Sequence, residues 1–304
     1  MEIKNILIAG GGMMGKNIAF VFASNPAYKI TVYDLYETDV HGGIRSNCAS
    51  LKLEEGELEA RLSRISFTTD LDSDLIKSAD FVIEAVFEDM DVKRQTFAKL
   101  EERCRPDTIF CTNTSVMSPS EISRDLKYRE RFVGTHFWNP GHLIPLVEVV
   151  KSDATSDETA NTVMEVLAAV GKEPVLCKKD VPGFIANRMQ HALWREAISI
   201  VENGIADAET VDKAVRYSFG LRLPQLGPIE NADMVGLDLT YNIHDYILRD
   251  LEDSHKPSPL LQKLRDEGKL GFKSGEGFRN WTPEEIAKSN AALNEYLVGM
   301  LYKD

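Results

Sequence analysis

Two residues near the middle of the chain have types and a spacing suited to proton transfer. His136 and Glu148 lie in the segment FVGTHFWNPGHLIPLVEVV, residues 132–150, where two apolar runs flank the turn sequence Asn-Pro-Gly. Apolar runs of this kind predict β-strands, and two strands joined by a turn can bring both side chains together. A carboxylate bound to one imidazole nitrogen fixes the tautomer and stabilises the protonated ring, which leaves the other nitrogen to accept a proton. The pattern predicts a histidine general base that Glu148 orients.

The same residues also allow a purely structural interpretation. In it, His136 is a core histidine whose ring binds a backbone carbonyl, and Glu148 lies at a strand edge. Burying a carboxylate among valines is unfavourable unless it is paired, which is the reason to expect a partner. His142 competes for the role of base, but it follows the turn and is expected to be solvated.

A glycine-rich segment near the N-terminus, GGGMMG, has the GxGxxG spacing of dinucleotide-binding turns. It lies between an apolar segment that predicts a strand, residues 3–9, and a segment with helical spacing. The first glycine permits a tight turn, the second lets the backbone approach a pyrophosphate at the helix N-terminus, and the third lets helix and strand pack closely. The residues assigned to the cofactor here are Gly10, Gly12, Met13, Met14 and Gly15.

Asp34 ends the next predicted strand, residues 29–33. A carboxylate at this position accepts hydrogen bonds from the adenosine ribose hydroxyls and repels a 2′-phosphate. No arginine follows it directly. The sequence therefore predicts NAD rather than NADP as the cofactor, with a simple turn cap as the alternative role of Asp34.

The composition indicates a globular protein that acts on a small molecule. The chain has 304 residues, 43% of them hydrophobic and 27% charged, which suits one large or two ordinary domains. A formal net charge of −13 disfavours nucleic acid and anionic membranes as partners, and no apolar run approaches a membrane span in length. Four cysteines without a CxxC pair argue for a reducing, cytoplasmic location and against a metal site.

Strand and helix patterns alternate in the first part of the chain and give way to helices in the second. Strands are predicted at residues 3–9, 29–33, 81–83 and 108–111, on both sides of residues 139–141, and at 174–176. After KKDVPG, helical patterns follow at residues 184–203, 209–218, 229–237, 239–250, 259–266 and 283–301. We therefore expect an α/β fold, with a doubly wound sheet over residues 1–180 that includes a helical hairpin at 37–65, and an all-α domain over residues 181–304.

Several motifs occur in a fixed order between about residue 4 and residue 281. They are GGGMMG with Asp34, IEAVFEDMDVK, NTS, HFWNP followed by LVEVV, DVPGFIANR, GPIENADMVGLD and KSGEGF. This ordered set resembles the L-3-hydroxyacyl-CoA dehydrogenase family. The resemblance implies a Rossmann-type NAD-binding domain followed by a helical domain that usually forms a homodimer.

The resemblance also implies roles for individual residues. His136 corresponds to the catalytic base and Glu148 to its orienting partner, and Ser115 and Asn187 correspond to polar residues near the reacting oxygen. The positions that line the nicotinamide half of NAD are Glu88, Lys93, Asn113, Ser115, Asn139 and Lys273.

Each carried-over role has a structural alternative. Ser115 is also suited to cap the following helix, and Asn187 to bind backbone near the domain boundary. Glu88 and Lys93 suit an exposed ion pair of little energetic weight, and Lys273 suits a solvated loop.

The expected reaction is hydride transfer between NAD and a short-chain 3-hydroxyacyl-CoA. A departure from the family leaves an alternative open, a related dehydrogenase of a small non-CoA hydroxy acid or alcohol. The family hairpin that meets the CoA phosphates is longer and often rich in lysine, whereas residues 37–65 are slightly acidic. A non-catalytic NAD-binding protein is a third hypothesis. The basic residues of this segment are Arg45, Lys52, Arg61 and Arg64, set among Glu54, Glu55, Glu57 and Glu59.

Overall fold

The computed structural model describes residues 2–51 and 53–301 of the chain. These residues form two compact units. The first comprises the chain up to Ala186 together with residues from Ala292 onward, and the second is Asn187–Ala291. Over the described residues, no helix is both long enough and apolar enough to cross a membrane.

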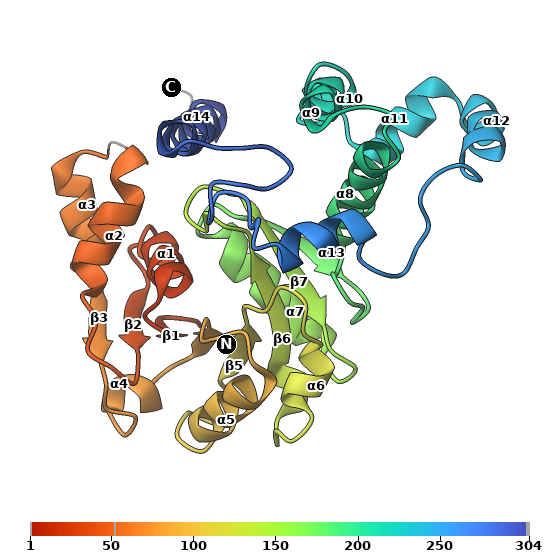
Figure 1. Cartoon of the computed structure of the whole chain (residues 1–304). Helices are drawn as coiled ribbons and strands as arrows, with labels where there is room; N and C mark the ends of the chain where they lie inside the picture. Colours follow the sequence, from red (N-terminus) through yellow and green to blue (C-terminus); the bar gives the residue numbers. More distant parts are fainter. Residues whose placement is uncertain (1, 52, 302–304) are drawn as a thin grey trace. The chain divides into compact units, whose positions relative to one another are not determined.

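The first unit is built on a sheet that, over the described residues, has eight strands in the order β3-β2-β1-β4-β5-β6-β7-β8 (Figure 1). Neighbouring strands run parallel except β6 and β7, which are antiparallel. The strand order reverses between β1 and β4, as in a doubly wound nucleotide-binding sheet, and the expected fold class is confirmed. The strands are β1 (Asn5–Ala9), β2 (Lys29–Tyr33), β3 (Ile65–Thr68), β4 (Phe81–Glu84), β5 (Ile109–Thr112), β6 (Phe132–Phe137), β7 (Leu146–Lys151) and β8 (Glu173–Cys177).

Helices cover both faces of this sheet because successive strand residues point to opposite sides. Ile8 and Ile83 belong to a core shared with α1, α2, α3 and α7, whereas the adjacent Leu7 and Val82 belong to a core shared with α4, α5 and α6. The helical segments are α1 (Met13–Phe22), α2 (Val40–Cys48), η1 (Ala49–Leu51), α3 (Glu55–Leu62), α4 (Asp74–Lys77), α5 (Met90–Glu101), α6 (Pro119–Ser123), η2 (Arg129–Arg131) and α7 (Asp157–Ala168).

Side-chain caps determine where several of these helices begin. Asp39, Asp89, Ser118 and Ser156 precede α2, α5, α6 and α7, and each accepts a hydrogen bond from a backbone N–H of the first turn. Such caps satisfy N–H groups that have no partner inside the helix. The caps of α5 and α6 therefore hold the loops that follow β4 and β5, at the edge of the sheet where the predicted site residues lie.

The sequence patterns did not predict β3. It follows directly on the two helices α2 and α3, which form in the segment 37–65 as expected. Of its residues only Ile65 is buried, so it has little of the alternating pattern that marks a strand. It pairs with β2 at the edge of the sheet, from Ile30↔Ile65 to Tyr33↔Thr68, and this neighbour determines its conformation.

The second unit is helical over the described residues, apart from isolated bridges around Gly271 and Glu276. Gly236, with φ +102°, separates two helices. These helices begin at Pro228 and Leu237, one and two residues before the starts that the sequence pattern predicts. The short helix α10 was not predicted, because four residues contain too little periodicity to recognise. The helices are α8 (Ala186–Glu202), α9 (Ala208–Arg216), α10 (Phe219–Arg222), α11 (Pro228–Val235), α12 (Leu237–Ile247), α13 (Pro259–Asp266) and α14 (Pro283–Leu301), the last of which continues into the first unit.

Candidate active site

His136 and Glu148 face each other across the antiparallel pair β6 and β7. Their Cα atoms are register partners, and His136 Nδ1 lies 2.8 Å from Glu148 Oε2. His136 is 5% exposed and Glu148 is fully buried. The alternative placement, with the carboxylate at a strand edge, does not occur, because β8 covers the far side of β7. The two strands therefore bring together the pair that the sequence predicts.

Glu148 is anchored on three sides. Its Oε1 accepts backbone N–H groups of Ile185 and Ala186, each at 2.9 Å, and its Oε2 lies 3.3 Å from Trp138 Nε1. Burial alone raises the pKa of Glu148, but the hydrogen bonds from His136 and from the two N–H groups outweigh burial and bring the pKa below its ordinary value. Glu148 is therefore a carboxylate at neutral pH.

Two aromatic rings surround the histidine. The Trp138 ring centroid lies 5.4 Å from that of His136, and the Phe184 centroid lies 5.8 Å from it. Phe184 is buried and adopts φ +49°, a conformation that is uncommon for a non-glycine residue. Phe184 is the last residue of the turn at residues 181–184. The next two residues, Ile185 and Ala186, donate the N–H groups that bind Glu148. The pair thus lies in apolar surroundings, in which a charge on the imidazole is strongly influenced by its carboxylate partner.

The glycine turn has the geometry that a dinucleotide site requires. Gly10 has φ +117°, and a side chain there would meet the carbonyl oxygen of Ala85 at 2.5 Å. A side chain at Gly15 would meet the carbonyl oxygen of Gly10 at 1.8 Å. Open space surrounds Gly12, the residue that precedes α1 without a side-chain cap. The first N–H groups of α1 thus have no side-chain cap, as at a helix N-terminus that binds an anion.

Asp34 lies directly beside this turn. Its Oδ2 accepts the Gly11 N–H at 2.7 Å, and its Oδ1 accepts the Tyr36 N–H at 3.2 Å. The second bond is the turn cap that was the structural alternative for this residue, so the side chain both caps its own turn and binds the glycine turn. Its position after β2 matches the position of a carboxylate that binds the adenosine ribose.

Asn113 and Ser115 follow β5 at the same edge of the sheet. Asn113 Oδ1 accepts the Phe137 N–H at 2.9 Å, which ties this loop to the strand of His136. Ser115 is exposed, and its N–H donates to Glu88 Oε1 at 3.0 Å. Ser118, not Ser115, caps α6. The structural alternative for Ser115 is therefore excluded.

Glu88 and Lys93 form a pair, but Lys93 is not exposed. Its side chain is fully buried and lies 2.8 Å from Glu84 Oε1 and 3.1 Å from Glu88 Oε2. Sequence reasoning did not single out Glu84. The signal was available, because Glu84 is a carboxylate at the end of the apolar run Phe81–Glu84, as Glu148 is within its own apolar strand.

Three other predicted site residues are less informative in the structure. Asn139 is exposed, directly after Trp138. Asn187 is buried and Lys273 is exposed, and both belong to the second unit. Their contacts with substrate or cofactor stay predictions that rest on the resemblance.

The expectation that His142 is solvated is wrong. It is 7% exposed, and burial together with the nearby Lys172 ammonium lowers its pKa to about 4. Lys172 is also buried and donates to the carbonyl oxygens of Gly141 and Ile144, at 2.7 and 2.8 Å. The loop between β6 and β7 is thus bound by a buried lysine from outside it, which no local pattern predicts.

The three arginines of the segment 37–65 each have a neighbouring partner. Arg45 forms ion pairs with Glu55 and Glu59. Arg61 pairs with Glu57, and Arg64 donates to a backbone carbonyl at 2.9 Å. Lys52 lies outside the described residues. The charges of Arg45 and Arg61 are therefore balanced by glutamates of the hairpin itself, whereas Arg64 has a neutral backbone partner.

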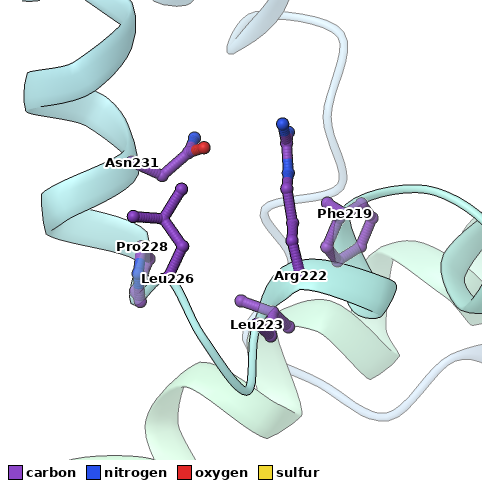
Figure 2. Close-up of a pocket in the computed structure, with 6 residues that line it drawn as sticks. All are labelled: Phe219, Arg222, Leu223, Leu226, Pro228 and Asn231. Carbon is purple, nitrogen blue, oxygen red and sulfur yellow. The ribbon is translucent and has the colours of Figure 1, made fainter.

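A shallow pocket of about 240 Å³ lies within the second unit, where α10 leads into α11 (Figure 2). Its walls are mainly apolar, with one guanidinium and one amide among them. It contains none of the residues that the sequence assigns to the site. The lining residues are Phe219, Arg222, Leu223, Leu226, Pro228 and Asn231.

Two family profiles match consecutive parts of the chain. The NAD binding domain of 3-hydroxyacyl-CoA dehydrogenase matches residues 5–181, and the C-terminal domain of 3-hydroxyacyl-CoA dehydrogenase matches residues 183–281. The chain belongs to the 3-hydroxyacyl-CoA dehydrogenase family. It is an NAD-dependent oxidoreductase that acts on CH–OH groups, as expected from the motifs.

Relatives in the family differ in their substrates. The chain is 32% identical to 5-formyl-3-hydroxy-2-methylpyridine 4-carboxylate 5-dehydrogenase of Mesorhizobium japonicum, over 98% of this chain and 97% of the relative. It is 37% identical to mitochondrial hydroxyacyl-coenzyme A dehydrogenase of Homo sapiens, over 91% of this chain and 90% of the relative.

Solved structures extend this comparison. The crystal structure of the pyridine carboxylate dehydrogenase, an NAD⁺-dependent dismutase, matches with a TM-score of 0.88 and 31% identity, over 98% of this chain and 97% of that one. The crystal structure of (S)-3-hydroxybutyryl-CoA dehydrogenase from Ralstonia eutropha matches with a TM-score of 0.76 and 29% identity, over 92% of this chain and all of that one. This 3-hydroxyacyl-CoA dehydrogenase family member thus resembles both a dehydrogenase named for a CoA thioester and one named for a pyridine carboxylate.

Proposed function

We propose that this protein transfers hydride between NAD and a small hydroxy compound that carries its own carboxylate and no CoA. The observation that carries the proposal is the pairing of two hairpin arginines, Arg45 and Arg61, with glutamates of the same hairpin. Phosphate recognition relies on Arg, Lys or helix N-termini, and a base that is already neutralised by a neighbouring acid attracts a phosphate weakly. The similarity to a dehydrogenase of a pyridine carboxylate over nearly the whole of both chains supports the same conclusion.

In the proposed mechanism His136 moves the proton. Its Nδ1 is bound to Glu148, so Nε2 is the nitrogen that takes the hydroxyl proton during oxidation and returns it during reduction. Glu148, whose pKa is below its ordinary value, stays anionic and stabilises the imidazolium. NAD, when bound, accepts or gives the hydride. General acid–base assistance of this kind contributes about 10²–10⁴ in rate.

The remaining site residues hold the reactants in this scheme. By the resemblance, Ser115 and Asn187 are assigned to the reacting oxygen, and Asp34 holds the adenosine ribose while the glycine turn holds the pyrophosphate. The residues proposed to hold the nicotinamide half of NAD are Glu88, Asn113, Ser115, Asn139 and Lys273, with Lys93 acting through Glu88 because its side chain is fully buried.

A second candidate function is oxidation of a short-chain 3-hydroxyacyl-CoA. The matches to both 3-hydroxyacyl-CoA dehydrogenase domains and the 37% identity to the human mitochondrial enzyme favour it. In this case the CoA phosphates would bind basic side chains other than Arg45 and Arg61, which are already paired with glutamates.

A comparison of kcat/KM among four substrates tests the two candidates. The substrates are 3-hydroxybutyryl-CoA, its thioester truncated at pantetheine, free 3-hydroxybutyrate and an aromatic hydroxymethyl carboxylate. The proposal expects no advantage of the CoA thioester over the truncated form and the highest value for a carboxylate. A large advantage of the full CoA thioester would establish the second candidate instead.

We also propose that the protein is a homodimer formed through its helical unit. Large apolar side chains on α8 and α12 are exposed there, and burial between subunits is a common arrangement for such a surface. Light scattering at micromolar concentration is expected to give twice the chain mass, and Trp194→Glu is expected to shift it toward the monomer. A wild-type monomer would contradict this. The side chains concerned are Met189, Leu193, Trp194, Leu239 and Ile243.

A further inference from the structure

A buried chain of charges lies beside the glycine turn. Glu84, the last residue of β4, pairs in register with Ala9 of β1 and Thr112 of β5, so it lies in the middle of the sheet at its carboxyl edge. Lys93 enters from α5, and its Nζ lies within ion-pair distance of both Glu84 and Glu88. The side chains of Glu84 and Lys93 are fully buried, whereas that of Glu88 is 38% exposed. One ammonium therefore connects an interior carboxylate to a carboxylate at the surface of the site.

Glu84 has partners on both oxygens. Its Oε1 accepts the Val86 N–H at 2.7 Å as well as Lys93, and its Oε2 accepts the Thr112 hydroxyl at 2.7 Å. Burial raises the pKa of Glu84, although Lys93 opposes this. An interior carboxylate is unfavourable for folding by itself, and a buried ion pair is often no better than apolar residues of the same size. A role other than stability therefore accounts for it better.

Glu88 connects the buried Glu84–Lys93 pair to the loop that contains Ser115. Its Oε1 accepts the Ser115 N–H and the Thr114 hydroxyl, and its Oε2 faces Lys93. The position of Ser115 thus depends on Glu88, the position of Glu88 on Lys93, and the position of Lys93 on Glu84. The Lys93 side chain and the two carboxylates have few other ways to pack, because each of the three charged groups needs a partner of opposite charge in the protein.

We propose that Glu84 is a positioning residue for the dehydrogenase reaction. By holding Lys93, it keeps Glu88 and the backbone of Ser115 in the geometry that receives the nicotinamide half of NAD. It acts through its neighbours and touches neither substrate nor cofactor. The proposal rests on the proposed placement of the nicotinamide and holds for either candidate substrate.

Glu84→Gln tests this role, with Asp80→Asn as the matched control. Asp80 directly precedes the same strand, is also buried, and binds the backbone N–H groups of Lys4 and Asn5 and the Arg105 guanidinium at the opposite end. Both variants are expected to lower the melting temperature. Glu84→Gln is expected to raise the Kd for NADH about tenfold, in line with the loss of a charged hydrogen bond, whereas Asp80→Asn leaves it within about twofold. Equal changes in both variants would reduce Glu84 to a structural residue.

A double-mutant cycle tests the path through Lys93. Lys93→Met leaves two carboxylates without their cation, so it is expected to weaken NADH binding more than Glu84→Gln does. In the Lys93→Met background, Glu84→Gln is expected to restore part of the affinity, because it removes one uncompensated charge. Additive losses would overturn the proposal.

Two further variants test the role of Glu84 and the placement of the cofactor separately. If Glu84→Gln does not fold, Thr112→Val removes a single hydrogen bond from Glu84 and is expected to raise the Kd for NADH a few-fold, and an unchanged Kd would overturn the proposal. Asp34→Ala examines the cofactor site independently of this network. If it leaves NADH affinity unchanged, the proposed cofactor placement fails rather than the role of Glu84.

Discussion

The His136–Glu148 pair and the α2–α3 hairpin both join a basic side chain to a carboxylate, but in opposite surroundings. The side chains of His136 and Glu148 are 6% and 0% exposed, whereas those of Arg45 and Glu59 in the hairpin are 42% and 50% exposed. Charges attract strongly where water is excluded and weakly where water and salt screen them. The same kind of contact therefore has a different function in each place.

In the interior, pairing fixes which atom is available for chemistry. The bond from Nδ1 to Glu148 leaves Nε2 as the nitrogen that we propose to meet the substrate, and the Glu84–Lys93 pair likewise fixes the position of a buried ammonium. On the hairpin, pairing contributes little to stability and mainly cancels charge that a phosphate would otherwise meet. Removal of a partner should therefore be severe in the interior and mild on the hairpin.

His136→Gln should have the largest effect. Loss of the proton acceptor is expected to lower kcat by about 10²–10⁴, while the Kd for NADH stays within about twofold, because the cofactor is held by the glycine turn and Asp34. Steady-state kinetics and fluorescence titration measure the two quantities. His255→Gln, which changes an exposed histidine, serves as the control. Near-normal turnover in His136→Gln would place the base elsewhere.

Glu148→Gln should come next. The amide keeps the shape of the side chain but removes the charge that stabilises the imidazolium, so kcat is expected to fall by about 10². Because the folded-state pKa of Glu148 is depressed, its charge is present above the ordinary carboxyl pKa and is lost only as the pH falls below it. Titration of Glu148 should therefore cause no loss of wild-type activity near neutral pH. Full activity in the variant would show that the charge of this buried pair is dispensable.

His142 extends the comparison to acid stability. Its folded pKa of about 4 lies below the model-peptide value of 6.5, so the unfolded chain binds a proton more readily between these values. Stability from this group is fully present above pH 6.5 and is lost as the pH falls toward 4, by about 3 kcal/mol at most. Urea unfolding at several pH values should show a flatter acid dependence for His142→Gln than for the wild type. An unchanged slope, with the same slope in His255→Gln, would mean that His142 is accessible to protons in the folded state.

Asp34 is half-buried, so the effect of replacing it should lie between those of the interior pair and of the exposed hairpin pairs. Asp34→Ala is expected to weaken NAD binding about tenfold and to reduce the preference for NAD over NADP, since it removes both the ribose acceptor and the repulsion of a 2′-phosphate. Isothermal titration with both cofactors checks this. Equal wild-type dissociation constants for NAD and NADP would contradict the assignment.

The hairpin should show the smallest effect. Glu55→Gln with Glu59→Gln releases Arg45 from both partners, so kcat/KM for 3-hydroxybutyryl-CoA is expected to rise a few-fold at low salt and not at high salt. The melting temperature should stay unchanged within error, because exposed pairs contribute little. Glu209→Gln, which breaks an exposed pair with Lys213 on α9, is the control. A large loss of stability would remove the contrast with the interior pair.

Local features of the chain were sufficient to predict much of this molecule. The GxGxxG spacing, the apolar strand segments and the acidic end of the second strand are encoded within a few residues, so the nucleotide-binding fold and Asp34 followed from the sequence. His136 and Glu148 were also accessible, because a short turn joins their strands and restricts how far apart they lie. In each case the geometry depends on neighbours in sequence.

Tertiary structure decided which partners several charged side chains acquired. The burial of Lys93 between two carboxylates, the pairing of Arg45 with glutamates of another helix, and the enclosure of His142 by Lys172 each join segments that no local period connects. The edge strand β3 is a similar case, since its conformation comes from pairing with β2. The physical reason is that a charge or a backbone N–H acquires its energy from whatever the folded chain places beside it, and that partner is known only once the chain has packed.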